Sequence, residues 1–256
     1  MKNNIKNKIS GCDNCCDVGN RMAFLLKTPI AHRGFHDKDC PENSKGAFKK
    51  AIENNFVIEL DLRILKDGKV IVFHDAGLMR MCGVRKYVKK CRYNELKDLK
   101  LNNTSYSIPT FAEVLNFVNG KVPLLIELKT SFFGRKLEKE VLRLLKGYKG
   151  EYAIQSFNPL SLKWLKKHAI DIPRGYLSSF FDGSLSFAKK MVKRLCFARS
   201  CTINFISYDM KNLPNKYVEK YKNLPLIAYT VSSKKEWQQV KPYVDNIIFE
   251  NFNPKK

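Results

Sequence analysis

The chain has 256 residues, 44% of them hydrophobic, which is enough to bury one substantial core and suits a single barrel domain. Its 47 basic and 24 acidic residues give a formal net charge of +23. Because these charges are spread along the chain without a nucleic-acid motif, they argue against a nucleic-acid partner, whereas a weak attraction to anionic membrane surfaces stays open. No apolar run approaches the ~20 residues of a membrane span, which argues against an integral membrane protein.

Residues 1–27 are predicted to form a polar N-terminal extension that ends in a short helix. Its apolar run is too short for the core of a signal peptide. The eight cysteines of the chain follow no regular framework, which favours free thiols and a cytoplasmic location. Cys12, Cys15 and Cys16 lie close together in the extension, but no second pair of metal ligands lies nearby, so a thiol cluster is favoured over a metal site.

The first strand is predicted at 30–32 and ends in the run His32-Arg33-Gly34. A second polar run, Pro41-Glu42-Asn43-Ser44, precedes apolar residues at helical spacing between 47 and 52. Asn43 or Ser44 is therefore expected to cap a helix. These two runs concentrate a histidine, an arginine and an acid near the start of the predicted fold.

The second predicted strand, residues 56–62, carries two acids among apolar residues. Glu59 and Asp61 are two positions apart, so their carboxylates point to the same face of a strand. Two buried carboxylates repel each other unless a cation lies between them, and hard oxygen ligands at this spacing suit Mg²⁺ or Ca²⁺. A solvated acidic edge is the alternative, but the apolar neighbours argue against it.

A hairpin is predicted next, because Asp67-Gly68 is a turn signal between two apolar runs. Only eight residues separate Asp61 from Val70, too few for a helical crossover. Counting outward from the turn pairs Asp61 with His74, which would place a histidine beside the carboxylates. The alternative is a surface hairpin that ends in an incidental histidine.

The rest of the chain alternates strands with amphipathic helical patterns. A rim insertion is expected at about 76–107. Strands are predicted at 124–128, 152–155, 174–177, 203–207, 226–229 and 246–249, and helices at 108–117, 137–145, 159–168, 185–197, 215–222 and 234–240. This alternation favours a (β/α)8 TIM barrel at 28–256, with a hairpin after strand two, in a single domain.

Five motifs in this order resemble the glycerophosphodiester phosphodiesterases, a family of the phosphatidylinositol-phospholipase-C-like phosphodiesterase superfamily. They are His32-Arg33-Gly34, Pro41-Glu42-Asn43-Ser44, Glu59-Leu60-Asp61, His74-Asp75 and Glu127-Leu128-Lys129. The resemblance covers roughly residues 29–254. Two departures, Tyr229 where the family usually has tryptophan and the closing run 249–254, concern substrate choice more than the phosphodiester chemistry.

The resemblance implies roles for ten residues. Glu59, Asp61 and Glu127 would hold one divalent cation, Mg²⁺ or Ca²⁺. His32 and His74 would act as acid and base. Substrate binding is implied for Arg33, Glu42, Lys129, Gln155 and Tyr229.

Three of these assignments keep open alternatives or details. A buried ion pair between Glu127 and Lys129 is an alternative to their roles in the site, and a core glutamine is the alternative for Gln155. Tyr229 is expected to line the pocket mouth and to discriminate only modestly between head groups.

The implied activity is metal-dependent hydrolysis of small-molecule glycerophosphodiesters to sn-glycerol 3-phosphate and an alcohol. A lysophospholipase D-like activity is an alternative, in which Leu78, Met79 and Met81 of the insertion could contact an acyl chain. A non-catalytic barrel that binds a phosphorylated ligand is a second alternative. The sequence leaves open the head group, the metal, and whether water or the substrate's own hydroxyl attacks first.

Overall fold

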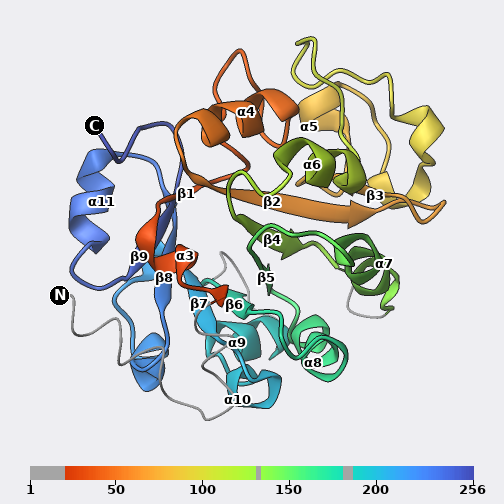
Figure 1. Cartoon of the computed structure of the whole chain (residues 1–256). Coiled ribbons are helices and arrows are strands. Elements are labelled where there is room, and N and C mark those ends of the chain that lie inside the picture. Colours follow the sequence, from red (N-terminus) through yellow and green to blue (C-terminus); the bar gives the residue numbers. More distant parts are fainter. Residues whose placement is uncertain (1–20, 131–133, 181–186) are drawn as a thin grey trace. The chain divides into compact units, whose positions relative to one another are not determined.

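The computed structural model describes residues 21–130, 134–180 and 187–256 (Figure 1). The chain divides into two compact units. We call Ala31–Glu151 the site unit, and Met1–Ile30 with Tyr152–Lys256 the flanking unit, and describe each by itself. The expectation of a single domain stays a prediction.

The described strands form one sheet with the hydrogen-bonded order β1-β9-β8-β7-β6-β5-β4-β2-β3, and an additional pairing of β1 with β2 closes the order and leaves β3 outside. The predicted (β/α)8 barrel with a hairpin after strand two is confirmed. The strands are β1 (Ile30–Ala31), β2 (Val57–Ile64), β3 (Val70–Val72), β4 (Leu124–Leu128), β5 (Tyr152–Ser156), β6 (Arg174–Ser178), β7 (Phe205–Asp209), β8 (Leu226–Val231) and β9 (Asn246–Phe249).

In the site unit, β2 pairs in parallel with β4, with Asp61 opposite Glu127. Every residue of β4 is buried, as are the first six residues of β2, so Glu59, Asp61 and Glu127 lie in the buried part of these two strands. Helices and turns connect the strands: α4 (Lys45–Glu53), α5 (Met79–Cys82), η1 (Val88–Lys90), η2 (Tyr93–Glu95), α6 (Phe111–Val118) and α7 (Lys136–Leu145).

Helix α4 begins as its sequence predicts. The side chain of Ser44 accepts a hydrogen bond from the Ala47 backbone N–H, at 3.1 Å, and so satisfies one of the free donors of the first turn. Asn43, the other candidate cap, has a left-handed backbone with φ of 57° and turns its side chain toward β2. Of these two adjacent residues, Ser44 therefore caps α4 and Asn43 contacts β2.

The hairpin forms, but the predicted register is wrong by one residue. Leu62 pairs with Val72 and Ile64 with Val70, which places Phe73, not His74, opposite Asp61. The Phe73 backbone N–H donates to the Asp61 carbonyl at 2.8 Å. The loop closes between Leu65 and Lys69 over three residues, with Gly68 at φ of 84°, whereas the prediction assumed a two-residue turn.

The insertion after β3 has a small hydrophobic core of its own. The buried residues of this core are Leu65, Ile71, Phe73, Leu78, Met81, Val88, Cys91, Leu96, Leu101 and Ile108. Leu78 and Met81 are thus enclosed, and only Met79, 58% exposed, is free to meet a ligand. The idea that all three side chains contact an acyl chain is therefore wrong.

In the flanking unit, β5 to β9 pair in parallel in sequence order. Its helices and turns are α3 (Phe24–Lys27), α8 (Pro159–His168), α9 (Phe187–Lys193), α10 (Ala198–Cys201), η3 (Met210–Asn212), η4 (Val218–Tyr221) and α11 (Lys234–Val240). The helix expected at 215–222 is only a 3₁₀ turn, because Asn215 accepts from the backbone N–H groups of Tyr217 and Val218 and holds a tight loop there.

Two further expectations concern cysteines and membranes. The cysteines in the described part of the chain are all free thiols, and Cys12, Cys15 and Cys16 lie outside the described residues. Among the described helices, none is both long and apolar enough to cross a membrane.

Gly34, in the loop after β1, is expected to tolerate no side chain. Its φ is 82°, and an added Cβ would lie 2.9 Å from Ala47 and Phe48 of α4. Gly34→Ala should lower the free energy of unfolding by roughly 2–5 kcal/mol, from the left-handed backbone and the overpacking together. Gly68→Ala is the matched control, since φ is 84° but no atom lies within 4 Å of the added Cβ. Equal urea midpoints for the two variants would contradict the close packing of the loop on α4.

Candidate active site

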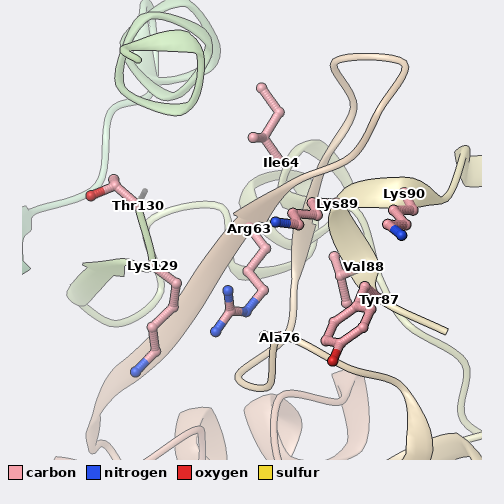
Figure 2. Close-up of a pocket in the computed structure, with 9 residues that line it drawn as sticks. All are labelled: Arg63, Ile64, Ala76, Tyr87, Val88, Lys89, Lys90, Lys129 and Thr130. Carbon is pink, nitrogen blue, oxygen red and sulfur yellow. The ribbon is translucent and has the colours of Figure 1, made fainter. Parts of the chain in front are cut away.

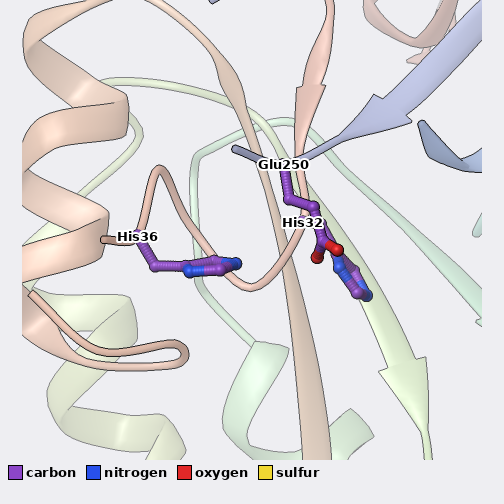
Figure 3. Close-up of side chains that lie close together, drawn as sticks. All are labelled: His32, His36 and Glu250. Atoms are coloured by element: carbon purple, nitrogen blue, oxygen red, sulfur yellow. The ribbon is translucent and has the colours of Figure 1, made fainter. Parts of the chain in front are cut away.

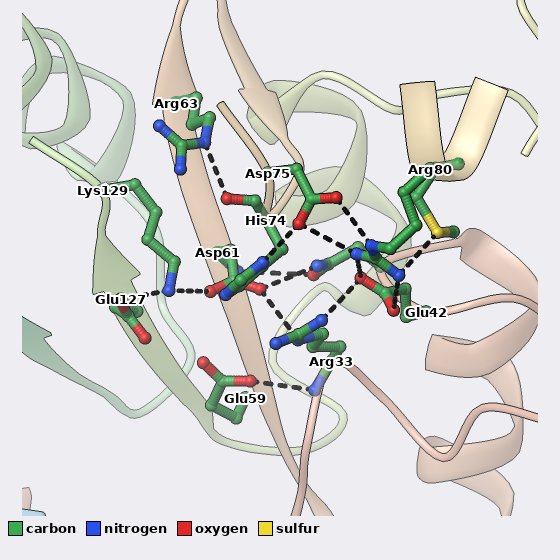
Figure 4. Close-up of polar contacts among 12 residues, drawn as sticks. Arg33, Glu42, Glu59, Asp61, Arg63, His74, Asp75, Arg80, Glu127 and Lys129 are labelled. Atoms are coloured by element: carbon green, nitrogen blue, oxygen red, sulfur yellow. Dashed lines mark hydrogen bonds and ion pairs between the residues drawn. The ribbon is translucent and has the colours of Figure 1, made fainter. Parts of the chain in front are cut away.

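Three buried carboxylates from the two neighbouring strands β2 and β4 converge (Figure 4). Glu59 and Asp61 of β2 are each 1% exposed and Glu127 of β4 is 6% exposed. Each offers a carboxylate oxygen, and these three oxygens lie within 4.8 Å of one another. The two-residue alternation of β2 and its register with β4 bring them together, as the sequence predicts.

The three acids affect one another's pKa values, because their charges lie close together in a buried site. Burial, followed by the charges of Asp61 and Glu127, raises the pKa of Glu59 well above its usual value. Burial also raises the pKa of Glu127, despite the lowering influence of Lys129. Burial would raise the pKa of Asp61 too, but Lys129, His74 and Arg33 outweigh it and keep that carboxyl ionised. A divalent cation fits this set, because its charge would relieve the repulsion and its preferred ligands are carboxylate oxygens.

Two cationic side chains flank the acids. Lys129 Nζ lies 3.1 Å from Asp61 Oδ1 and 2.5 Å from Glu127 Oε1. Arg33 Nε lies 3.5 Å from Asp61 Oδ2. The ion pair between Glu127 and Lys129 that the sequence left open is thus present, but Lys129 also contacts Asp61. We call Glu59, Asp61 and Glu127 the acid group.

His74 follows β3 and faces Asp61 (Figure 4). Its Nδ1 lies 2.7 Å from Asp75 Oδ1. Because the Asp75 carboxylate accepts hydrogen bonds, Nδ1 carries a proton and the lone pair lies on Nε2. Burial, together with Lys129 and Arg33, lowers the pKa of His74 to about 4. The imidazole is therefore neutral near pH 7 and can accept a proton at Nε2.

Arg80 of α5 connects the histidine to the first loop. It donates to both oxygens of Asp75, at 2.6 and 3.0 Å, and to both oxygens of Glu42, at 2.7 and 2.8 Å. Glu42 in turn accepts from Arg33 Nη1 at 2.7 Å. This arginine was missed from the sequence, because it stands in the insertion outside every motif.

Arg80→Gln should lower kcat by about tenfold with a small change in KM, since Asp75 and Glu42 lose the group that fixes them and His74 loses its orientation. Arg143→Gln is the matched control, because Arg143 also donates from two nitrogens to one carboxylate, that of Glu140 on the surface of α7. Steady-state kinetics of both variants provide the measurement. Equal rates for the two variants would show that Arg80 only stabilises the insertion.

Asn43 and Arg63 were also missed. Asn43 Nδ2 donates to Asp61 Oδ2 at 2.9 Å, and its Oδ1 accepts from the Asp61 backbone N–H at 3.3 Å. Arg63 Nε donates to the His74 carbonyl at 2.8 Å. The signal for Arg63 was available, because it lies two positions after Asp61 and hence on the same face of β2.

His32 follows β1 directly and is half-buried (Figure 3). The next two residues attach this loop to Glu59. The Arg33 backbone N–H donates to Glu59 Oε2 at 2.9 Å, and the Gly34 N–H donates to the Glu59 carbonyl at 3.2 Å. The loop that carries the first predicted catalytic histidine is therefore fixed to a predicted metal ligand.

Gln155 and Tyr229 lie in the flanking unit. Gln155 is 1% exposed, and its Oε1 accepts from Ser207 Oγ at 2.8 Å, which suits the core-glutamine alternative. Tyr229 donates its hydroxyl to the Ser178 carbonyl at 2.8 Å. The substrate roles of both residues stay predictions.

Comparisons with known proteins identify the family of this chain. The model of the glycerophosphoryl diester phosphodiesterase family matches residues 32–253. An uncharacterized protein of Mycoplasma genitalium is 32% identical over 245 residues, which cover 89% of this chain and 95% of that protein. The glycerophosphodiester phosphodiesterase of Caldanaerobacter subterraneus is 35% identical over 159 residues, covering 58% of this chain and 65% of the relative.

Solved structures share the fold. An Oleispira antarctica phosphodiesterase in complex with the product sn-glycerol-3-phosphate has a TM-score of 0.75 at 21% identity, over 88% of this chain and 93% of that one. The putative glycerophosphoryl diester phosphodiesterase of Silicibacter pomeroyi has a TM-score of 0.74 at 18% identity, over 90% and 93% of the two chains.

Proposed function

Because this chain belongs to the glycerophosphoryl diester phosphodiesterase family, we propose that it hydrolyses glycerophosphodiesters to sn-glycerol 3-phosphate and an alcohol, with one divalent cation, Mg²⁺ or Ca²⁺. The observation that carries this proposal is the group of Glu59, Asp61 and Glu127 beside His74 and Lys129. The product bound to the Oleispira antarctica phosphodiesterase supports the same reaction.

The cationic side chains bind the phosphate. Arg33 and Lys129 are mostly buried, at 16% and 14% side-chain exposure, so their charges are poorly screened by water. A cation held by Glu59, Asp61 and Glu127 would neutralise phosphate charge and stabilise the charge that develops during the reaction. The pKa of Lys129 is raised by Asp61 and Glu127 against the effect of burial, so this ammonium stays charged at neutral pH.

The two histidines move the protons. His74 is neutral near pH 7 with its lone pair on Nε2, so it accepts the proton of the attacking hydroxyl. His32 then protonates the oxygen of the leaving alcohol. The same pair serves direct attack by water and attack by the substrate's own hydroxyl, because in the second route the roles exchange when water opens the cyclic phosphate.

Both alternative functions have less support than the proposed one. Lysophospholipase D of Rattus norvegicus is 32% identical over 141 residues, which cover half of this chain and 44% of that protein. Of the insertion residues proposed to meet an acyl chain, however, only Met79 is exposed. A non-catalytic barrel is disfavoured because each predicted catalytic and metal-binding residue is present. The cytoplasmic location stays a prediction.

Turnover of glycerophosphocholine beside lysophosphatidylcholine tests the proposal. We expect glycerophosphocholine to be hydrolysed in Mg²⁺ or Ca²⁺, activity to vanish with a chelator, and the cation to restore it. Preferred turnover of lysophosphatidylcholine would favour the lysophospholipase D activity, and undiminished rates in metal-free protein would reject the metal site.

A further inference from the structure

A pocket of about 550 Å³ lies beside the acids in the site unit, and its function is not explained by the reaction described above (Figure 2). Its described lining residues are Arg63, Ile64, Ala76, Tyr87, Val88, Lys89, Lys90, Lys129 and Thr130. Four of these nine are cationic and none is acidic. Lys129 lines the pocket and also contacts Asp61 and Glu127 of the acid group, so the pocket adjoins the candidate active site.

Strand periodicity explains why Arg63 and Lys129 line this pocket. Arg63 lies two residues beyond Asp61 on β2, and Lys129 lies two residues beyond Glu127, directly after the end of β4. Each cation therefore shares a face with its acid, one step further toward the carboxyl end of the strand. Since Asp61 is in register with Glu127, Arg63 and Lys129 follow the acids at corresponding positions, and Lys129 reaches back to contact both.

Arg63 has no carboxylate within ion-pair distance among the described residues, although it is half-buried. Its Nε donates to the His74 carbonyl, which leaves the two terminal nitrogens for the pocket. A half-buried guanidinium without a counter-ion favours an anionic ligand.

The insertion contributes further cations to the pocket. The turn η1 carries Lys89 and Lys90, both exposed, and Tyr87 precedes it. Figure 2 shows Arg63, Lys89 and Lys129 around one hollow, with the Tyr87 ring at its side. A ligand with an ammonium group would meet repulsion here, whereas a phosphate or carboxylate would be attracted.

We infer that this pocket binds a second anionic group, foremost a phosphate, on the alcohol portion of the substrate. The inference rests on the proposed function and narrows its substrate class to soluble glycerophosphodiesters whose alcohol is itself negatively charged. The charge must lie on the alcohol, because the glycerol portion of the diester is uncharged. The reacting phosphate lies over the acids and Lys129, and the second anion lies over Arg63 and Lys89.

Three diesters test the inference on the full chain loaded with its cation: glycerophosphoglycerol, the same diester with a terminal phosphate, and glycerophosphocholine. At low ionic strength we expect kcat/KM for the phosphate-bearing diester to exceed that for glycerophosphoglycerol by about tenfold, with glycerophosphocholine lowest. The preference should shrink at about 0.5 M salt, because salt screens exposed charges. Lys89→Gln should reduce the preference about threefold and leave kcat/KM for glycerophosphoglycerol within about twofold.

Lys97→Gln is the matched control, since it removes the same charge from an exposed site of the insertion that does not line the pocket. An equal loss of preference in both variants would assign the effect to net charge and overturn the inference. Turnover of all three diesters without preference would overturn it as well but leave the proposed function intact. Failure to hydrolyse any of them, with either cation, would reject the proposed function and this inference with it.

Discussion

Asp61→Asn should weaken the binding of Mg²⁺ or Ca²⁺ by about 100-fold or more, and phosphodiesterase activity should fall with it. Loss of a partner outside the ligand shell typically costs 10–100-fold in metal affinity, so loss of a ligand itself should reach at least the upper end of that range. Asp61 is central to the group, since it contacts Lys129 and Arg33 and lies opposite Glu127. Calorimetric titration of the metal-free variant measures the affinity directly.

The fold should survive this substitution. The amide can keep the hydrogen bond from Asn43, and Lys129 keeps its contact with Glu127. One of the charges that raise the pKa of Glu59 also disappears, which relieves repulsion in the metal-free protein. Glu138→Gln is the matched control, because Glu138 is a carboxylate of α7 that is 1% exposed and lies outside the acid group. Unchanged cation affinity in Asp61→Asn would remove this residue from the ligand set.

The sequence predicted the acid group because its causes are local. Glu59 and Asp61 share a face through the two-residue period of a strand, and apolar neighbours indicate their burial. Glu127 was assigned to the same site from the resemblance to the family, and the parallel pairing of β2 with β4 explains why it lies beside Asp61. What these residues bind and catalyse stays a prediction.

Predictions that depended on turn geometry fared less well. The hairpin register is off by one residue because Asp67-Gly68 forms part of a three-residue loop and not the whole of a two-residue turn. The strand β2 also runs two residues beyond its predicted end, because Arg63 and Ile64 pair with β3. Sequence signals mark where a chain turns, but the residue count of the loop decides which side chains face each other.

Arg80 could not be predicted, because its contacts depend on the fold of the insertion. Its partner Glu42 lies 38 positions away in the sequence, and Asp75 lies five positions away. The insertion core, which contains Leu78 and Met81, positions α5 so that Arg80 reaches both. A contact of this kind follows from packing and not from any local period.

His32→Ala and His74→Ala should each lower kcat by about 10²–10⁴-fold, the range expected when a general acid or base is removed. Neither histidine belongs to the acid group, so the affinity for the cation should stay within severalfold of that of the unaltered chain. Because the pKa of His74 is lowered to about 4, this imidazole is neutral above that pH and gains a proton only as the pH falls through it. The His74-dependent rate should therefore persist to about pH 5 and fall below it.

His168→Ala is the control for these two variants. His168 ends α8, stacks on Trp164 with ring centroids 4.1 Å apart, and has its Nδ1 2.9 Å from the Trp164 carbonyl. Its loss removes an imidazole of similar size without touching the acid group, so the rate should stay within about twofold. A loss below tenfold in His74→Ala would assign that residue to positioning, because the contribution of a proton-transfer group exceeds this. The same loss accompanied by weaker cation binding would instead show that His74 acts through Asp61, whose carboxylate it faces across the site.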